Sequence, residues 1–533
     1  MNVANHFSTP DLTLVNAHVI TLDPLSPRAN WVEIRGGKIA STGYDRELNK
    51  PGCGDARIID CRGMTIIPGF IDAHIHLSSF AESFLTTDVG PRSDVRAISD
   101  IQTKIRQLSQ ESPGGTWIRC GGYNEFYLAE KRHPNRWDLD SASVFHPVKL
   151  THQTGHAHVL NSLALKVTGI SKDTSDPDGG LIDRDTRTGE PTGLLYGMGS
   201  YLSKVVPPLY THELDQGAEL ANDELLSLGI TSVQDTSSRN TIDRWRRFRR
   251  WKVRRYLKPR VSMALSPECF EGYRRREFSA EVIDNCLRIN GVKIIVDETT
   301  GRLNPTQNEL NDLVLTIHRS GLQAIIHAIE EAAIESACSA VEYALQQLPK
   351  PDHRHRVEHC AVCPPALAKR LASLGIMVVT QPPFIYYNGD RYLGTVPEMQ
   401  LKHLYPLATL MENGVHVAGS SDCPVVPPNP LIGIYSAISR MSKTGEFVAT
   451  TEGITPLDAV RMYTDYAART TFEEGVKGTI TPGKLADLIV LDGDPTKLPL
   501  DEIKEIQVEM TVLNGEIVWD KNGLANDPSF HIQ

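Results

Sequence analysis

The chain has 533 residues, of which 40% are hydrophobic and 23% charged, and its formal net charge is -10 at pH 7. This composition is that of an ordinary globular protein with a large core, and the length suits a large barrel plus a smaller domain. The acidic balance argues against a general nucleic-acid-binding protein, and no apolar run approaches the roughly 20 residues that cross a bilayer.

The first residues, MNVANHFSTPDLTLVNAHVI, lack the basic region followed by an apolar region that is typical of a secretory signal. The nine cysteines are odd in number and widely scattered, so they do not form a disulfide framework in a chain of this length. We therefore expect a cytoplasmic protein with reduced thiols.

Short stretches of alternating apolar residues, interrupted by glycine and aspartate, indicate β-hairpins at both ends of the chain. Near the start these are LTLVNAHVITLD, WVEIRGGKIASTG and ARIIDCRGMTIIPG, and near the end they are ADLIVLDGD and VEMTVLNGEIVW. We expect residues 1–64 and 478–533 to form one small, composite β-sandwich domain that is built from both termini.

Between these ends, eight short apolar strands alternate with helical stretches, which is the pattern of a (β/α)8 TIM barrel of the α/β class. The strands are expected at residues 65–77, 229–235, 261–266, 291–297, 323–328, 355–360, 376–381 and 415–422. The interval after the first strand is too long for one crossover and has its own strand and helix signals. We expect the barrel to cover 65–477, with an inserted subdomain at about 80–225.

The run RNTIDRWRRFRRWKVRRYLKPR at 239–260 is dense in arginine, with Trp245, Phe248, Trp251 and Tyr256 interleaved. It is either an anion- or nucleic-acid-binding patch, or a solvated amphipathic helix whose aromatic side chains pack inward. No nucleic-acid-binding fold motif accompanies the run, and this favours the helix.

Polar residues end several of the expected barrel strands, where side chains at the carboxyl ends point into the mouth of the barrel. They are His74 and His76 on the first strand, Lys293 on the fourth, His327 on the fifth, His359 on the sixth and Asp422 on the eighth. Residues i and i+2 of a strand face one side, so His74 and His76 could bind one ion together. Singly, each histidine could be a hydrogen-bonded core residue. The full ordered set predicts a site for Zn²⁺ or a related divalent ion.

Long motifs follow one another in order over nearly the whole chain. They are PGFIDAHIHL, THQTGHAHVLNSLAL (151–165), GGLIDRDTRTGEPTGLLYG (179–197), GVKIIVD, IIHAIE, RVEHC, TQPP, GSSDCPVVPPNPLIGIYSAISR, TEGITPLDAVRMYTDYAART and GTITPGKLADLIVLDGDP. With these motifs the chain resembles the amidohydrolase superfamily of metal-dependent hydrolases. Within it, the chain looks like the YtcJ-like branch, which includes N-substituted formamide deformylase.

The resemblance implies a role for each strand-end residue. His74, His76 and Asp422 would bind the more buried metal ion. Lys293, carboxylated on its amine, would bridge to a second ion held by the remaining two histidines, and burial next to cations would favour this by lowering the pKa of the lysine. The sequence leaves the identity of the metal, and the choice between one ion and two, open.

The resemblance further implies an enzyme that uses a metal-activated hydroxide to cleave a non-peptide C–N bond, of the amide or N-formyl type, in a small molecule. Asp422 would accept the proton of the attacking water and return it to the leaving amine. His156, in the TGHAH of the insert, would contact substrate and stabilise the oxyanion, whereas His152 and His158 would be structural.

Two alternatives stay open at this point. The same scaffold could hydrolyse an ester, a carbamate or a cyclic amidine. From a different class of protein, some relatives of the superfamily have lost their metals and act as binding or assembly proteins, but that class predicts missing ligands and all six positions are filled here. We expect a small-molecule substrate, no nucleic acid and no membrane, with a homodimer as one candidate assembly.

Departures from the pattern of the branch add acidic residues near the expected mouth. The segment HAIEE places Glu330 and Glu331 where the branch has glycine and aspartate, and DETTGR places Glu298 after the lysine strand. These residues are either solvated groups at a helix start, which the helix dipole favours, or contacts for a cationic group of the substrate.

Two further segments have a functional and a structural interpretation. The aromatic segment PPFIYYNGDRYLG (382–394) is expected to form a loop, in which Tyr386 and Tyr387 either line the substrate pocket or pack to stabilise the loop. The pair Cys360 and Cys363 forms a single CxxC, which is a weak zinc signal without a second pair and favours packing.

Overall fold

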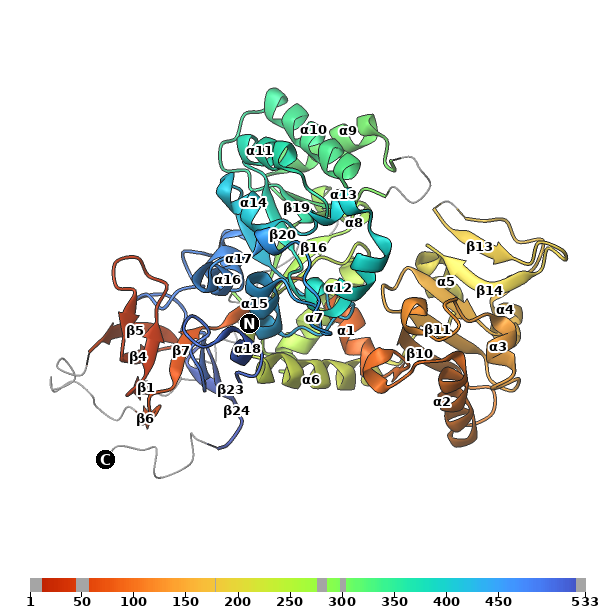
Figure 1. Cartoon of the computed structure of the whole chain (residues 1–533), viewed down its shortest axis with the longest axis horizontal. Helices are drawn as coiled ribbons and strands as arrows, with labels where there is room; N and C mark the ends of the chain where they lie inside the picture. Colours follow the sequence, from red (N-terminus) through yellow and green to blue (C-terminus); the bar gives the residue numbers. More distant parts are fainter. Residues whose placement is uncertain (1–11, 45–56, 178, 276–284, 298–302, 524–533) are drawn as a thin grey trace. The chain divides into compact units, whose positions relative to one another are not determined.

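The computed structural model describes residues 12–44, 57–177, 179–275, 285–297 and 303–523 (Figure 1). The chain consists of two compact units, residues 1–77 with 221–533 and residues 78–220. Each unit is described by itself. None of the helices in the described ranges combines the length and the apolar character that crossing a bilayer requires.

The larger unit is built around an eight-stranded parallel sheet. Its strands, in spatial order, are β8 (Phe70–Ile75), β15 (Ile230–Asp235), β16 (Arg260–Leu265), β17 (Leu287–Ile295), β18 (Gln323–Ala328), β19 (Arg356–His359), β20 (Met377–Thr380) and β21 (Val417–Gly419). The eight predicted strands are confirmed, and their order is that of a TIM barrel. Sequential order of parallel neighbours is expected when each strand is followed by a crossover to the next.

The sheet closes where β8 meets the segment that follows β21. Ile75 and Cys423 form an isolated parallel bridge there. Just below it, the Asp72 carboxylate accepts hydrogen bonds from the backbone N–H of Ser421 at 3.1 Å and from its hydroxyl. We refer to this junction of β8 with residues 421–423 as the closing seam.

The prediction of a single strand at 65–77 is wrong in one respect, because this segment contains two strands. Thr65–Pro68 forms β7, which pairs with terminal strands, and only Phe70 onwards joins the barrel as β8. Gly69 separates the two. A Cβ at this position would lie 2.4 Å from side-chain atoms of Thr231, so the close approach of the chain to β15 requires glycine.

Helices surround the barrel in the larger unit. They are α6 (Thr211–Ser227, shared with the smaller unit), α7 (Ile242–Val253), α8 (Pro267–Arg274), α9 (Gln307–Ser320), α10 (Glu331–Gln347), α11 (Pro365–Ser373), α12 (Pro383–Thr395), α13 (Glu398–Leu401), α14 (Leu407–Glu412), α15 (Pro430–Ser439), α16 (Pro456–Met462), α17 (Asp465–Arg469) and α18 (Leu500–Ile503). On α7, Trp245, Phe248 and Trp251 are buried. The arginine-rich run is therefore the amphipathic helix that the sequence favoured.

Helix α12 corrects the expectation of an aromatic loop at 382–394. Pro383 stands in the first turn, where its missing N–H costs no hydrogen bond, and a regular helix follows. Phe384 and Tyr392 of this helix are buried in a hydrophobic cluster together with Tyr405. The aromatic residues that suggested a pocket lining thus include core residues of a helix.

Two further sheets contain the terminal segments. One has the order β5 (Lys38–Gly43), β4 (Trp31–Arg35), β1 (Leu12–Val15) and β6 (Arg57–Asp60), and the other β24 (Glu516–Asp520), β23 (Val508–Leu513), β22 (Leu488–Leu491), β7, β2 (His18–Ile20) and β3 (Arg28–Ala29). Figure 1 shows the red N-terminal strands beside the blue strands β23 and β24. A single hydrophobic cluster takes Leu14 and Val32 from the first sheet and Val490 and Val512 from the second.

The smaller unit begins directly after β8. Its sheet has the order β13 (Leu181–Arg184), β14 (Pro191–Tyr196), β12 (Ala157–Leu160), β11 (Val148–His152), β10 (Ile118–Tyr123) and β9 (Thr87–Asp88), with helices α1 (Leu77–Ser83), α2 (Ile98–Glu111), α3 (Arg136–Asp140), α4 (Ser162–Thr168) and α5 (Gly199–Val205). Ile101 and Ile105 of α2 share a hydrophobic cluster with Val148 and Leu150 of β11. This unit therefore has a core of its own.

A buried pair of histidines lies where β18 begins. The backbone N–H of Ala324 donates to His355 Nδ1 at 2.9 Å, so that nitrogen has no proton of its own. His355 Nε2 then donates to His318 Nδ1 at 2.8 Å, and His318 Nε2 donates to the carbonyl of Leu348 at 2.8 Å. This directional chain is satisfied only by neutral rings. Burial, reinforced by the neighbouring histidines, holds the pKa of His355 well below its usual value.

This arrangement predicts an acid-sensitive contribution of His355 to stability. Below about pH 6.5 the unfolded chain takes up a proton on His355 that the folded chain does not, so the free energy of unfolding falls by up to about 1.4 kcal/mol per pH unit. We expect the melting temperature of H355Q, followed by circular dichroism, to fall less than that of the wild type between about pH 7.5 and 5.5. The exposed His212 provides the control, H212Q, which should keep the wild-type pH dependence. An unchanged pH dependence in H355Q would contradict the prediction.

Candidate metal centre

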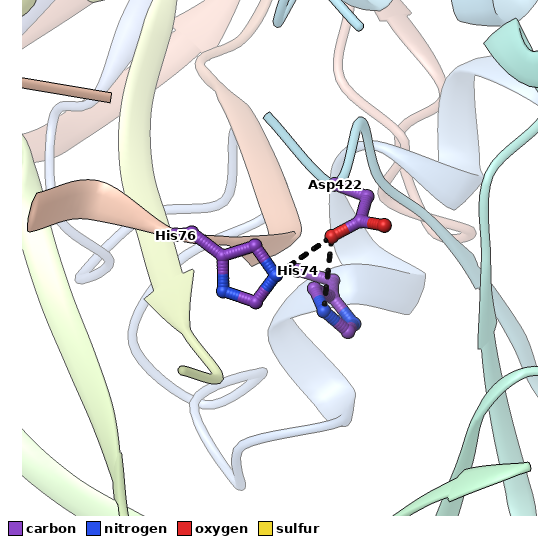
Figure 2. A group of neighbouring side chains, drawn as sticks. All are labelled: His74, His76 and Asp422. Carbon is purple, nitrogen blue, oxygen red and sulfur yellow. Dashed lines mark ion pairs between the residues drawn. The ribbon is translucent and has the colours of Figure 1, made fainter. Parts of the chain in front are cut away.

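His74 of β8, His76 just after the end of β8 and Asp422 after β21 point at one another (Figure 2). His76 Nε2 lies 2.9 Å from Asp422 Oδ1, and His74 Nε2 lies 3.4 Å from the same oxygen. Ligand atoms of the three residues all lie within 4.8 Å of one another. His74 and Asp422 are buried, and His76 is partly exposed. The alternation of a β-strand brings the two rings to one side, as the sequence predicted.

The closing seam holds these residues by their backbones as well. The N–H of Asp422 donates to the carbonyl of His74 at 2.9 Å, and the N–H of His76 donates to the carbonyl of Cys423 at 2.8 Å. Asp422 has a positive φ of 57°, and His359, at the end of β19, has a φ of 73°. Such left-handed conformations are costly for residues other than glycine and cluster at functional sites.

The other two predicted histidines extend this group. The ring of His359 lies 4.9 Å from the ring of His74 and 4.4 Å from the ring of His327, between centroids. His359 Nδ1 donates to Gln381 Oε1 at 2.9 Å, which leaves the Nε2 of a neutral ring as an electron-pair donor. Burial lowers the pKa of both His74 and His359, so both rings are neutral at pH 7.

Lys293 on β17 is buried, with 2% of its surface exposed. Within the described ranges, its Nζ has no hydrogen-bond partner. Burial lowers the pKa of this amine to about 8, although the charges of Glu358 and Asp422 oppose the shift. A buried amine with a depressed pKa and no partner is an unusual and costly feature of a folded protein.

Asp422 is a carboxylate at neutral pH. Burial alone would raise its pKa, but the neighbouring rings of His74 and His76 outweigh burial and hold the pKa below its ordinary value. The site therefore combines the negative charge of Asp422 with the neutral rings of His74 and His359, which is a set of groups that attracts a cation.

Sequence reasoning missed one residue of this group, Glu358. Its Oε2 contacts His74 Nδ1, and its Oε1 lies 2.6 Å from Arg356 Nε. Glu358 directly precedes His359 in the motif HRVEHC, where the pattern of strand-end histidines pointed to His359 alone. The available signal was an acidic residue inside a short strand that the barrel buries on both faces, since a carboxylate is almost never fully buried without a partner.

The remaining predicted contacts lie elsewhere or outside the described residues. His156 is exposed in the turn between β11 and β12 of the smaller unit, where its carbonyl accepts from the N–H of Gly197 at 2.9 Å. In the same unit, His152 Nε2 lies 2.9 Å from Glu125 Oε2, and His158 Nδ1 lies 3.3 Å from Thr151 Oγ1. His152 and His158 are thus buried in local contacts, as expected.

The acidic and aromatic residues that were candidates for contacting the substrate differ in where they lie. Glu330 is the exposed residue before the first turn of α10, so the helix-start interpretation holds for it. Glu298 lies outside the described residues. The ring of Tyr386 lies 5.1 Å from Tyr387 and 6.0 Å from Tyr435, between centroids, and Tyr387 also packs against the cluster that contains Phe384.

Several known proteins are similar to this chain over nearly its whole length. The YtcJ protein of Bacillus subtilis (strain 168), whose name assigns it provisionally to the amidohydrolases, is 28% identical, covering 93% of this chain and 97% of its own. N-substituted formamide deformylase of Arthrobacter pascens is 28% identical, covering 96% and 99%. The crystal structure of an uncharacterised metal-dependent hydrolase of Pyrococcus horikoshii OT3 superposes with a TM-score of 0.73 at 21% identity, covering 92% and 99%. A sequence profile described as "Amidohydrolase family" matches residues 57–519, and the chain therefore belongs to the amidohydrolase family.

Proposed function

We propose that this protein is a metal-dependent hydrolase that cleaves a non-peptide C–N bond, of the amide or N-formyl type, in a small molecule. The observation that carries the proposal is the convergence of His74, His76 and Asp422, whose ligand atoms all lie within 4.8 Å of one another. The Nε2 electron pair of the neutral His74 ring would face the Asp422 carboxylate unless a cation lay between them. A divalent ion, with Zn²⁺ the best candidate for this set of groups, resolves that conflict.

The remaining groups fit a second ion. His327 and His359 would hold it, and Lys293 would bridge the two ions after carboxylation. With a pKa of about 8, a substantial fraction of the Lys293 amine is neutral near pH 7.5, and the neutral amine can add carbon dioxide and release a proton. The absence of a hydrogen-bond partner for Nζ within the described ranges supports this role, because carboxylation replaces a costly buried cation with a ligand.

In the proposed reaction, the chain itself handles the protons. A bound divalent ion supplies Lewis acidity and lowers the pKa of a water molecule towards about 7. Asp422, which is held as a carboxylate, accepts the proton of that water as it attacks the carbonyl carbon, and then donates the proton to the leaving nitrogen. The resemblance to the family assigns His156 the role of donor to the developing oxyanion, and this role is part of the proposal.

The substrate class rests on the family and on one relative. Family membership supports a hydrolase, and the relative from Arthrobacter pascens is named for removing formyl groups from N-substituted formamides. Hydrolysis of an ester, a carbamate or a cyclic amidine remains the alternative on the same scaffold. A metal-free binding protein is disfavoured because each of the six ligand positions holds a residue that can bind a metal.

We also propose a division into domains that follows from the same architecture. Residues 1–64 and 478–533 form the composite β-sandwich domain, and residues 65–477 form the barrel domain with the insert at about 80–225. The hydrophobic cluster shared by the two terminal sheets and the separate compact unit at 78–220 support this division.

The function is tested by metal analysis and a substrate panel. We expect purified protein to contain one or two equivalents of a divalent metal, and the Zn²⁺- or Mn²⁺-loaded protein to hydrolyse an N-formyl or N-acyl compound faster than matched esters and carbamates. Failure to bind metal in stoichiometric amounts, together with no activation by added Zn²⁺ or Mn²⁺, would overturn the proposal.

Replacement of Asp422 by asparagine should remove the base. We expect D422N to stay folded and to lose kcat/KM by at least about 100-fold on the best substrate of the panel, because general base catalysis contributes about that much or more. Circular dichroism checks the fold. D243N, at an aspartate of α7 that is 80% exposed, is the matched control and should keep wild-type activity. Undiminished turnover by D422N would exclude Asp422 as the base.

Replacement of His156 separates a catalytic role from a structural one. If His156 donates to the oxyanion, its replacement by leucine, which has no donor, should lower kcat by about 100-fold with metal content unchanged. The control is H158Q, at a buried histidine of the same hairpin. This variant should lower the melting temperature, while the kcat of the folded protein stays close to that of the wild type. If H156L keeps its full kcat, then the oxyanion is stabilised by another group.

A further inference from the structure

We propose that Glu358, held in place by Arg356, is a positioning residue that fixes the ring of His74 with Nε2 turned towards Asp422. This inference rests on the proposed metal-dependent function and extends it to residues that do not bind the ion. It assigns a purpose to a buried ion pair inside the barrel that neither the strand-end ligands nor the packing of the core explains.

The contact of Glu358 with His74 decides where the proton of the imidazole lies. Glu358 Oε2 contacts His74 Nδ1, and a carboxylate oxygen can only accept a hydrogen bond. Nδ1 therefore carries the proton of the neutral ring, and Nε2 has the free electron pair. Since Nε2 lies 3.4 Å from Asp422 Oδ1, the electron pair faces the group with which it would share an ion. With the opposite tautomer, an N–H would occupy that space.

Glu358 is itself fixed by a chain of buried polar contacts. Arg356 Nε lies 2.6 Å from Glu358 Oε1, and both side chains are fully buried. Arg356 Nη1 donates to Gln234 Oε1 at 2.5 Å, and Gln234 Nε2 donates to Thr470 Oγ1 and to the carbonyl of Ala467, each at 2.9 Å. The chain runs from β8 through β19 and β15 to α17, so the ring of His74 is anchored across the interior of the barrel.

Partners of this kind are expected around a metal ion. A histidine ligand commonly donates its other ring N–H to a carboxylate, and loss of that carboxylate lowers metal affinity or activity by about 10- to 100-fold. His76 has a weaker equivalent, since its Nδ1 lies 3.1 Å from Ser237 Oγ. The fully buried, charged partner of His74 marks that ring as the one whose orientation matters most.

Two double variants with the same net charge test the inference. In R356M/E358M, both buried charges are replaced by apolar side chains of similar length, a change that often leaves stability unaffected. His74 Nδ1 then has no acceptor for its hydrogen bond. In R356M/E358Q, the amide oxygen of the glutamine can accept from Nδ1 with no arginine competing for it. We expect the first variant to bind Co²⁺ at least about 10-fold more weakly than the wild type, and the second to recover most of that loss.

Affinity is measured against a chromogenic chelator, and the visible absorption of the bound Co²⁺ reports whether the ligand field has changed. The matched control is R260M/D487N, which removes a buried ion pair that is remote from the metal centre, with a 2.6 Å contact and side chains each 4% exposed. This control should keep the affinity and the spectrum of the wild type.

Each outcome distinguishes the inference from the function on which it rests. If the wild type binds no Co²⁺, the proposed function fails, and the inference falls with it. If the wild type binds Co²⁺ and both R356M variants bind equally well, whether tightly or weakly, Glu358 is not a positioning residue, and the proposed function stands. A loss of the same size in R260M/D487N would show that the effect is general destabilisation and would likewise overturn the inference.

Discussion

The closing seam of the barrel is the interaction on which the rest of the structure depends. A parallel eight-stranded sheet becomes a barrel only when its first and last strands meet, and here they meet through Ile75, Cys423 and the Asp72–Ser421 hydrogen bonds. The same seam places Asp422 beside His74 and His76. Closure of the sheet and the geometry of the candidate metal centre therefore depend on the same contacts, although the two sides of the seam lie far apart in the sequence.

The interior of the barrel is unusually rich in charge for a buried region. Glu358 and Arg356 neutralise each other, and Asp422 faces two imidazole rings. Breaking one partner of such a buried pair typically costs about 3–5 kcal/mol, so these groups persist only where each has a partner or a ligand. Lys293 departs from this pattern, because its buried amine has no hydrogen-bond partner within the described ranges. This is why the amine is the candidate for carboxylation in the proposed function.

The parts of the chain outside the barrel differ in how they are held. The terminal sheets share one hydrophobic cluster and join the barrel through the buried pair Arg260–Asp487, which links β16 to the segment before β22. The unit at 78–220 has its own core and its own sheet. Such an arrangement separates the closed sheet from loops and an insert, which tolerate sequence change that a closed sheet does not.

The sequence by itself determined the barrel strands and the polar residues at their ends that are candidate ligands, because both follow from local rules. Apolar runs of strand length, the alternation that pairs His74 with His76, and imidazole or carboxylate groups at carboxyl ends are all readable along the chain. The arginine-rich helix was readable for the same reason, since its aromatic residues recur with helical spacing.

Only the tertiary structure decided which side chains meet across the barrel. The division of 65–77 into two strands follows from the approach of Gly69 to Thr231, and the place of Glu358 follows from a contact with a histidine at the other end of the chain. The helix at α12 replaced an expected loop because its aromatic residues bury against Tyr405. Such contacts join residues that are distant in sequence, and no local pattern encodes which distant partner a buried polar group will find.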